Sequence, residues 1–326
     1  MQAPAEEETM ELRGNPSITL RQLWHFVTAA ESGTISEAAR RLHMAPSAIS
    51  MSLAELERLA GTQLCVKRKA HGLTLTSAGQ AAFAQARQIL DMADELVHLS
   101  SGTDRRQVRG PLTVGAYMPL APAVIPHMLR TFAATCPEVV VNFVEGYHED
   151  LQEQLLAGTL DVAFLYDVGL SPEIQSVSLM PVHPYLLLPE NHRLLEGEGA
   201  EAGAEDAELA LQQVAEEPVI LFNAPPISTR VLDLFREAGI APEIRHRSRS
   251  YATVRSLVGA GMGFSVLFQR PWLDLSYAGL GVASLPLTAR PDTDPQVCVA
   301  WARDVRLNAR SNAWIEVAQE SFRAAH

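Results

Sequence analysis

The feature that most constrains the fold is a set of three short helical patterns, joined by tight breaks, near the N-terminus. The stretch "TLRQLWHFVTAAESG" repeats apolar residues at helical spacing and ends at Gly33, a residue type that favours helix C-caps. A second helix is expected over "SEAARRLH", with Ser36 as its N-cap. The third begins at Pro46, whose fixed φ suits a first helical turn, and runs to Gly61. Together they predict a small helical domain.

The apolar positions of these patterns are the ones that we expect to be buried. On the first helix they are Leu20, Leu23, Trp24, Val27 and Ala30. On the third helix they are Ile49, Leu53, Leu56 and Leu59. The side chains on the remaining outer face of the third helix are mostly small or carry hydroxyl groups. Such a bland face is unusual for an exposed helix and needs a functional reason.

A hairpin and a longer helix follow the three helices. Two β-prone pieces, 63–66 and 73–76, flank a basic tip with Gly72, and a basic hairpin in this position predicts a wing. From Ser77 to about Ser100 the pattern is one helix. Its seam repeats every seven residues and consists of Phe83, Ala86, Leu90, Ala93 and Val97. The seam predicts pairing with a second copy of the chain, and the alternative is packing on its own wing.

The net charge of −12 argues by itself against a nucleic-acid partner, because phosphate binding requires positive surface. The average hides a local difference. Residues 17–76 contain seven basic and four acidic residues, a surplus of three positive charges, so the rest of the chain carries −15. This asymmetry fits a DNA-contacting module joined to a larger body that does not touch DNA.

Beyond a polar linker at 103–110, strands alternate with helices, which predicts an α/β body. Strands are expected at 112–117 and 139–145, and helices at 121–135, 148–157 and 228–238. The stretch 195–218 has eight acidic and no basic residues and is expected to be a surface insertion.

Composition and motifs bound the possible functions. No apolar run reaches the roughly 18 residues of a membrane span, and the acidic start is unlike a signal peptide, so a cytoplasmic location is expected. Cys65, Cys136 and Cys298 are far apart, which favours reduced, buried thiols over disulfides or a zinc site. The "YHED" at 147–150 is interpreted as a solvated helix cap, so no metal is expected. "GAGMGF" lacks the strand-to-helix setting of a dinucleotide loop, so no cofactor is expected either.

The stretch "LRQLWHFVTAAESGTISEAARRLHMAPSAISMSLAELERLAGTQLCVKRKAHGLTLTSAG" resembles the winged helix-turn-helix of LysR-type transcriptional regulators along its whole length. The body resembles the effector domain of that family, a relative of periplasmic solute-binding folds, in "GPLTVGAYMPLAPAVIPHMLRTF", "DLQEQLLAGTLDVAFLYD" and "SYATVRSLVGAGMGFSVL". The resemblance covers about residues 17–310. It implies a winged helix-turn-helix, a long linker helix and a C-terminal α/β domain of two lobes.

The resemblance also divides the chain into segments. They are a disordered leader (1–16), the winged helix-turn-helix (17–76), a linker or dimerisation helix (77–102), a hinge (103–110), the effector domain (111–310) and a C-terminal helix (311–326).

A recognition helix in the major groove explains the bland outer face, because its leading residues must approach base edges without steric conflict. The expected DNA contacts are Arg21, Ser36, Pro46, Ser47, Ser50, Met51, Ser52, Arg58, Lys67, Arg68, Lys69 and His71. Many relatives carry Ser or Thr, then Gln, where this chain has Ala45 and Pro46, and often Arg in place of Met51. Base discrimination is therefore expected to depend more on the wing and on DNA shape.

An effector is expected between the two lobes, where strand ends and helix N-termini converge. The expected lining is Tyr117, Met118, Pro119, Leu120, Tyr166, Asp167, Asn223, Ser228, Gly263, Phe264 and Ser265. Pro119 cannot donate a backbone amide, so a pocket less dedicated to carboxylates is expected.

The function implied is a ligand-responsive, sequence-specific DNA-binding regulator that performs no covalent chemistry. Its implied partners are operator DNA with inverted-repeat half-sites, a small-molecule effector, further copies of itself as a homodimer or homotetramer, and RNA polymerase, with no membrane. A solute-binding transport protein is one rival, and the attached winged domain opposes it. An enzyme is the other, and no G-x-S-x-G or H-E-x-x-H arrangement supports it.

Overall fold

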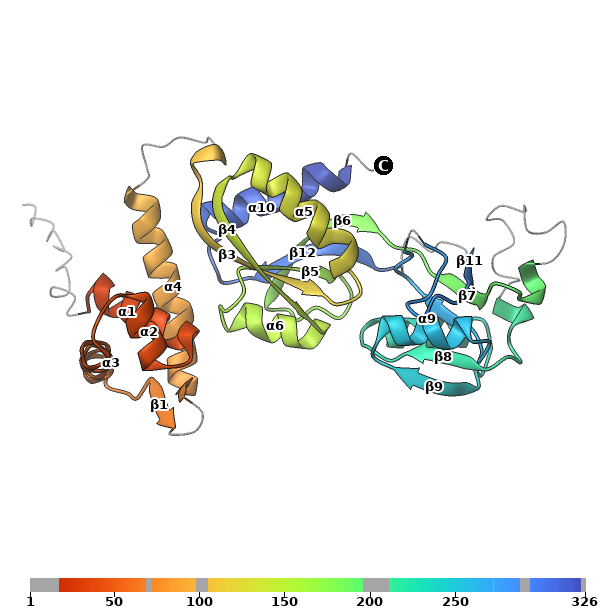
Figure 1. The fold of residues 1–326 in the computed structure, drawn as a ribbon, viewed down its shortest axis with the longest axis horizontal. Coiled ribbons are helices and arrows are strands. Elements are labelled where there is room, and N and C mark those ends of the chain that lie inside the picture. Colours follow the sequence, from red (N-terminus) through yellow and green to blue (C-terminus); the bar gives the residue numbers. More distant parts are fainter. Residues whose placement is uncertain are drawn as a thin grey trace, which may run out of the picture. The chain divides into compact units, whose positions relative to one another are not determined.

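The computed structural model describes residues 18–68, 72–97, 105–195, 211–271, 273–287 and 294–323. The chain divides into two compact units, Met1–Ser100 and Ser101–His326 (Figure 1). The leader, the wing-tip residues Lys69 and His71, and most of the acidic stretch lie outside the described residues.

The N-terminal unit contains three short helices, a hairpin and one longer helix, which confirms the winged helix-turn-helix. The elements are α1 (Leu20–Ser32), α2 (Ile35–Arg41), α3 (Pro46–Ala60), β1 (Cys65–Arg68), β2 (Gly72–Leu75) and α4 (Ser77–Val97) (Figure 1). Strands β1 and β2 pair antiparallel, with Cys65 opposite Leu75.

Local signals set most of the helix boundaries in this unit. Gly33 ends α1 in the left-handed conformation at φ 65°, as predicted. Pro46 begins α3, and Ala45 before it provides no side-chain cap. The predicted N-cap of α2 is wrong, because the hydroxyl of Thr34 accepts the hydrogen bond from the Glu37 amide while Ser36 lies inside the first turn.

The core of the N-terminal unit is built from the inner faces of all four helices. Its buried residues include Phe26, Val27, Ala29, Ala38, Ile49, Leu53 and Leu56. Two predicted core positions on α1 are corrected: Leu20 and Trp24 are about half exposed, because the inward face of α1 is centred on Phe26 and the predicted Val27.

The predicted seam of α4 is also corrected. Phe83 and Ala86 are buried in the core of their own unit, and the ring of Phe83 meets Phe26 edge-on at a centroid distance of 6.5 Å. Leu90 packs partly against the same core, and the side chain of Val97 is not described. The first part of the seam therefore stabilises the winged domain itself, through packing against α1.

The wing is attached by close backbone contacts and one carboxylate. The amide of Leu73 donates to Gly33 O at 2.6 Å, and a Cβ added at Gly72 would meet that oxygen at 2.3 Å, so only glycine fits. Glu57 of α3 accepts hydrogen bonds from the amides of Leu64 and Cys65, each at 2.8 Å. The carboxylate thus fixes where the wing begins relative to α3.

The C-terminal unit has two lobes, and the first, lobe I, is a five-stranded sheet with helices on both faces. The strand order is β4-β3-β5-β12-β6, with β3 parallel to β4 and β5 and with β12 antiparallel to β5 and β6. The elements are η2 (Arg105–Gln107), β3 (Arg109–Tyr117), α5 (Ala121–Thr135), β4 (Glu138–Gly146), α6 (His148–Leu156), β5 (Val162–Tyr166), β6 (Ile174–Pro181), β12 (Gln296–Ala302) and α10 (Ala309–Arg323). Helices α5 and α10 cover one face and α6 the other (Figure 1).

Lobe II is inserted between β6 and β12. Its sheets are β10-β7-β11, antiparallel, and β8-β9, parallel. The elements are β7 (Tyr185–Pro189), η3 (Arg193–Leu195), β8 (Val219–Phe222), α8 (Ile227–Glu237), β9 (Ile244–Ser248), α9 (Tyr251–Gly259), β10 (Ser265–Leu267) and β11 (Val282–Pro286). The α/β body with two lobes is therefore confirmed.

Two side-chain clusters hold the ends of lobe I. Arg105, just before β3, donates to Glu316 and to Glu320 of α10, with shortest distances of 2.8 Å to each. His183 and Asp294 lie on the two connections between the lobes, and Nδ1 of His183 is 3.0 Å from Oδ2 of Asp294.

Among the helices of the described ranges, none is long and apolar enough to cross a bilayer.

Candidate DNA-binding surface and effector cavity

One face of α3 is exposed and uncrowded. The exposed residues Ser47, Met51, Ala54 and Arg58 recur every three or four positions, so they form a single stripe along the helix. Met51 at its centre is 72% exposed. Because Ile49, Leu53 and Leu56 hold the opposite face in the core, the rotation of α3 about its own axis is fixed.

Ser52 lies beside this stripe and is held from behind. Its Oγ is 2.9 Å from Nδ1 of the buried His25 in α1. Burial, and then the charge of Arg21, lower the pKa of His25, so this imidazole is neutral near pH 7. Ser52 therefore ties α3 to α1 in addition to any contact with DNA.

The other predicted DNA contacts vary in their surroundings. Ser36, Pro46 and Arg21 are exposed and Ser50 is half-buried. Arg58 pairs with Glu55 of the same helix at 2.6 Å, so its guanidinium must leave this partner before it can contact a phosphate. Lys67 and Arg68 belong to β1, but their side chains, like Lys69 and His71, lie outside the description.

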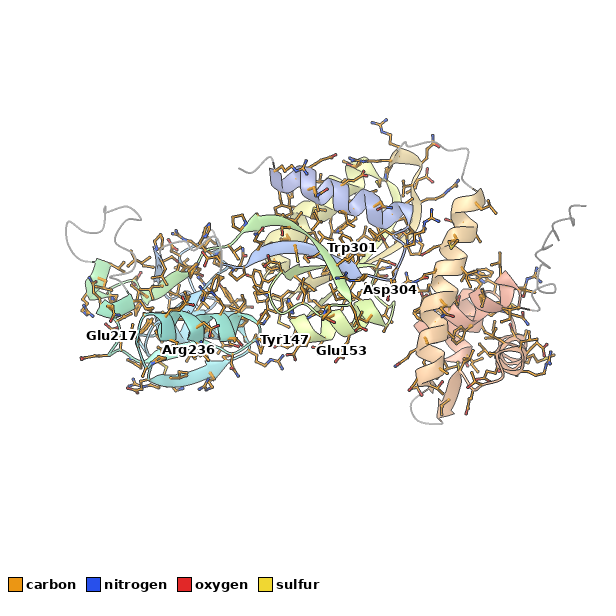
Figure 2. All side chains as sticks on the ribbon, turned by 180° about the vertical axis from the view of Figure 1, so that it is seen from behind. Tyr147, Glu153, Glu217, Arg236, Trp301 and Asp304 are labelled. Carbon is orange, nitrogen blue, oxygen red and sulfur yellow. The ribbon has the colours of Figure 1, made fainter. Side chains whose placement is uncertain are left out.

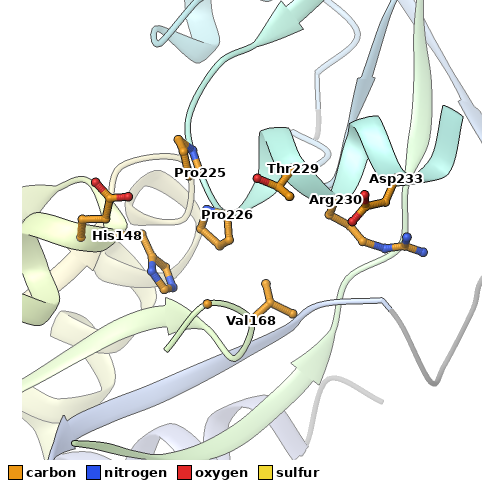
Figure 3. Close-up of a pocket in the computed structure, with 9 residues that line it drawn as sticks. His148, Val168, Pro225, Pro226, Thr229, Arg230 and Asp233 are labelled. Carbon is orange, nitrogen blue, oxygen red and sulfur yellow. The ribbon is translucent and has the colours of Figure 1, made fainter. Parts of the chain in front are cut away.

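A cavity of about 390 Å³ lies between the two lobes (Figure 3). Lobe I contributes His148, Glu149, Val168 and Gly169, and lobe II contributes Pro225, Pro226, Thr229, Arg230 and Asp233. The starts of α6 and α8 therefore both border it. The sequence predicts this convergence, but it does not predict these particular residues.

A hydrogen-bond chain fixes His148 at the cavity wall. Its Nε2 donates to Tyr166 O at 3.0 Å, and its Nδ1 accepts from the amide of Gln152 at 2.9 Å. The Gln152 carbonyl in turn accepts from the Ser171 amide, which fixes the orientation of the Gln152 side chain. His148 is 2% exposed, so the interpretation of "YHED" as a wholly solvated cluster is wrong for this residue.

The charges around the cavity are mixed. Arg230 is nearly buried and pairs with Glu237 at 2.8 Å. Asp233 pairs with the exposed Arg236, whereas Glu149 is an exposed carboxylate at the start of α6. A ligand would therefore meet polar groups from both lobes between apolar proline and valine side chains.

The eleven predicted effector residues do not line this cavity. Leu120 and Phe264 are fully buried in packed core, and Ser265 is also buried with its hydroxyl donating to Ile220 O at 2.7 Å. For these three residues the prediction is wrong, because their side chains point into the core. Ser228 is buried and Asn223 exposed, and a Cβ at Gly263 would meet Pro218 O at 2.1 Å.

The remaining predicted residues lie at or just after the ends of β3 and β5 in lobe I. Tyr117 and Tyr166 are buried with ring centroids 5.6 Å apart, and the Tyr117 ring also meets His148 edge-on. Asp167 is engaged with β12, accepting from the Gln296 amide at 2.8 Å. Met118 and Pro119 lie at the turn after β3, and Met118 N donates to Gly146 O.

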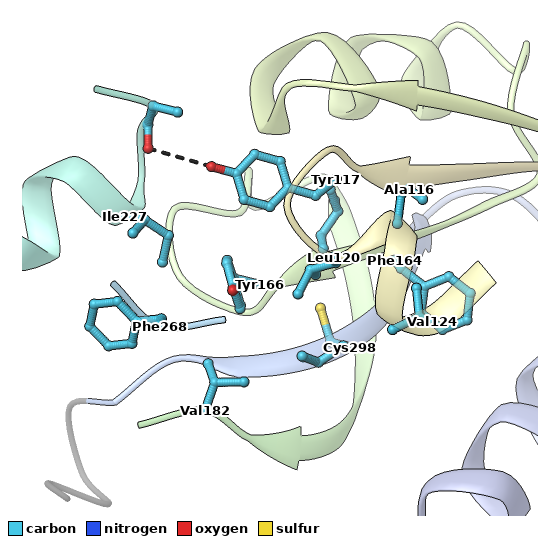
Figure 4. Close-up of a cluster of buried hydrophobic side chains, with 14 of the residues drawn as sticks. Ala116, Tyr117, Leu120, Val124, Phe164, Tyr166, Val182, Ile227, Phe268 and Cys298 are labelled. Carbon is cyan, nitrogen blue, oxygen red and sulfur yellow. Dashed lines mark hydrogen bonds between the residues drawn. The ribbon is translucent and has the colours of Figure 1, made fainter. Parts of the chain in front are cut away.

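Two contacts join the lobes directly. The hydroxyl of Tyr117 donates to Ala224 O in lobe II at 3.5 Å (Figure 4). The guanidinium of Arg249 lies 3.6 Å from the ring centroid of Tyr147, which is found where the two lobes meet (Figure 2). The sequence predicts neither contact, because each joins residues about 100 positions apart.

The stability of the C-terminal unit should depend on the charge of His148. Burial lowers its pKa, and a second proton on Nδ1 would remove the bond from Gln152. The unfolded chain titrates near the ordinary pKa of about 6.5, so the stability is present above that pH and is lost as the pH falls below it. We expect the Tm to fall between pH 7 and pH 5. The fall should be smaller in His148→Gln, and equal slopes in both proteins would contradict this origin.

The three thiols are expected to be unreactive in the folded protein. All are buried, and burial raises the pKa of Cys136 and raises that of Cys298 to about 12. A disulfide-exchange reagent at pH 8 should therefore release almost no signal from native protein and the equivalent of three thiols after denaturation. Rapid reaction of one thiol in native protein would show that its surroundings open.

Comparison with known proteins gives matches over both units. The profile of the lysR-family bacterial regulatory helix-turn-helix proteins matches residues 20–80, and that of the LysR substrate binding domain matches residues 105–323. TcbR of Pseudomonas sp. (strain P51), an HTH-type transcriptional regulator, is 28% identical over 301 residues, covering 89% of this chain and 99% of TcbR.

Solved structures agree with these matches. HinK, a LysR family transcriptional regulator from Pseudomonas aeruginosa, is 32% identical with a TM-score of 0.60, covering 94% of this chain and 99% of HinK. A full-length OxyR variant from Pseudomonas aeruginosa is 25% identical with a TM-score of 0.72, covering 94% of this chain and 97% of its own.

Proposed function

The chain belongs to the LysR family of transcriptional regulators, and from this premise we propose how its own residues divide the work. The exposed stripe of α3 enters the major groove of an operator, and a small-molecule effector binds in the cavity between the lobes. A second copy, paired through α4, supplies the other half-site, and the DNA-bound oligomer acts on RNA polymerase.

The observation that carries the DNA-binding proposal is the exposed α3 stripe. A helix can approach base edges only where its outward side chains are short or flexible, and Ser47, Met51 and Ala54 meet this condition. The serine hydroxyl can bond a base or phosphate, and the Met51 side chain can lie against a thymine methyl group. The free amides of the first turn favour a phosphate.

The proposed pairing surface lies on the face of α4 that the core leaves open. Ile89, Met92 and Leu96 are exposed at helical spacing, and apolar side chains in such a stripe favour a helix partner. This surface replaces the predicted seam, whose first residues are buried.

We expect Met92→Glu to convert the oligomer to monomer, because each pairing would bury two unpaired carboxylates. Sedimentation velocity measures the change. Gln80→Glu, at an exposed position on a different face of the same helix, is the matched control and should leave the oligomer intact. An unchanged mass for Met92→Glu would place the pairing surface elsewhere.

Selection of bound sequences from random duplex DNA by the purified chain tests the DNA-binding proposal. Twofold pairing predicts an inverted repeat whose half-sites are separated by whole helical turns, with affinity that falls steeply as salt rises. Enrichment of no motif, with weak binding even at low salt, would contradict the assignment of α3.

A cavity variant tests the effector proposal. Thr229→Trp should fill part of the 390 Å³ cavity and abolish the effect of any ligand that changes operator affinity, without changing affinity in its absence. A ligand response that survives in Thr229→Trp would show that the effector binds elsewhere.

A further inference from the structure

A buried arginine in lobe II has no counter-charge within the part of the chain that the structure describes. Arg255 of α9 is 4% exposed. Its Nη2 donates to two neutral oxygens, Leu273 O at 2.9 Å and Leu275 O at 3.1 Å, and its Nη1 is buried without an acceptor. No ion pair among the described residues includes it, and nearby Asp274 is half exposed and directs its carboxylate towards Arg270. A buried guanidinium normally has an anionic partner, because burial of an isolated charge is very costly.

Two further buried polar atoms on neighbouring elements also have no hydrogen-bond partner among the described residues. They are Oγ of Ser284 in β11 and Oε1 of Gln269, just after β10. Ser284 lies opposite Leu187 of β7, so its side chain shares a sheet face with Tyr185, two residues away. The Tyr185 hydroxyl is 2.8 Å from that of Tyr251 in α9, so this face of the sheet packs against α9.

The hydroxyls of the two tyrosines meet at the backbone of Gln269, the residue that carries one of these atoms. The hydroxyls of Tyr185 and Tyr251 both lie within hydrogen-bond distance of the backbone oxygen of Gln269. Burial raises the pKa of Tyr185, and a hydrogen bond with Tyr251, the charge of Arg255 and a hydrogen bond with Arg255 oppose the rise, so the guanidinium lies beside the phenol and has only neutral partners among the described residues. Because the two ends of a glutamine amide are interchangeable by rotation, Gln269 can offer an N–H in place of its unpartnered oxygen.

We propose that Arg255, Ser284 and Gln269 form a buried binding site for a small monoanion, a carboxylate or a halide, inside lobe II. The guanidinium supplies the charge, and the serine hydroxyl and the rotated amide supply further donors. This site shares no residue with the interlobe cavity, and it goes beyond the proposed function. Since Arg255 also holds the backbone at 273–275, an anion there would stabilise the start of the loop that leads to β11.

Thermal unfolding of the full chain in chloride, bromide, formate and acetate tests the proposal. At an anion concentration 100 times its Kd, the Tm of the C-terminal unit should rise by roughly 5 °C or more in wild type. Ser284→Ala should weaken this response and Arg255→Met should abolish it, while general salt effects remain in both. A larger response to formate and acetate than to the halides indicates a carboxylate ligand, and the reverse indicates a halide.

Gln269→Glu tests the same site with a substitution that should not destabilise the fold. Its carboxylate would supply the missing counter-charge, so we expect a higher Tm in the absence of added anion and no further response to anions. Diffraction from bromide-soaked crystals should show anomalous density beside Arg255.

Equal anion responses in wild type, Arg255→Met and Gln269→Glu, with no bromide at Arg255, would overturn the proposal. They would leave Arg255 as a tie for the 273–275 backbone. Operator binding is measured separately and does not decide this result.

Discussion

Ala54→Glu is expected to lower operator affinity about 100-fold or more. Ala54 lies on the exposed stripe of α3, one turn beyond Met51. A glutamate there would place a negative charge beside the DNA phosphates and a longer side chain against the base edges, and a like-charge contact in an interface costs several kcal/mol. The dissociation constant can be measured by fluorescence anisotropy with the selected operator, at two salt concentrations.

Ala60→Glu is the matched control, because it adds the same charge to the exposed last turn of the same helix but away from the stripe. It should change affinity much less, and both variants should unfold at nearly the same temperature as wild type. Equal losses in the two variants would mean that net charge alone, rather than the α3 stripe, governs binding.

Trp314→Ala is expected to destabilise the C-terminal unit by about 3–5 kcal/mol, the usual cost of truncating a buried aromatic side chain. Trp314 of α10 is fully buried, with ring centroids 4.8 Å from Phe132 of α5 and 6.1 Å from Phe164 of β5. The truncation therefore opens a cavity where a helix layer meets the sheet. Urea unfolding measures the loss, and the Tm should fall by roughly 10 °C.

Trp314→Phe separates packing from hydrogen bonding. The indole Nε1 is buried and has no acceptor among the described residues. Replacing Trp314 with Phe removes this unsatisfied donor, and the free energy gained offsets part of the free energy lost with the smaller ring. We expect this variant to lose much less stability than Trp314→Ala. If the two variants were equally destabilised, the indole N–H would have to make a stabilising contact.

Features that depend on neighbours in sequence are predicted best. Gly33 ends α1 and Pro46 begins α3 because each residue type has its own backbone preference. The helix predicted over 121–135 matches α5 to the residue. The alternation of strand and helix patterns after the linker indicates the α/β body. The error at Ser36 is also local, because Thr34, two residues earlier, accepts from the Glu37 amide and begins the helix sooner.

The helix faces show where periodicity stops being informative. The apolar period of α4 is real, but two apolar stripes run along this helix. Only packing decides that Phe83 faces the core of its own unit while Met92 remains exposed. The same holds for Trp24, whose spacing matches a buried face and whose side chain is 52% exposed.

By itself, the sequence determined the order of elements, the winged helix-turn-helix and the α/β body, because these depend on backbone preferences and on short-range periodicity. Only the tertiary structure decided which residues line the interlobe cavity and which charges are buried. His148, Gly169 and Pro226 meet there because separate strands and helices end at one place, and Arg255 is buried where α9 packs on its sheet. Such contacts join positions far apart in the chain, so no local pattern records them.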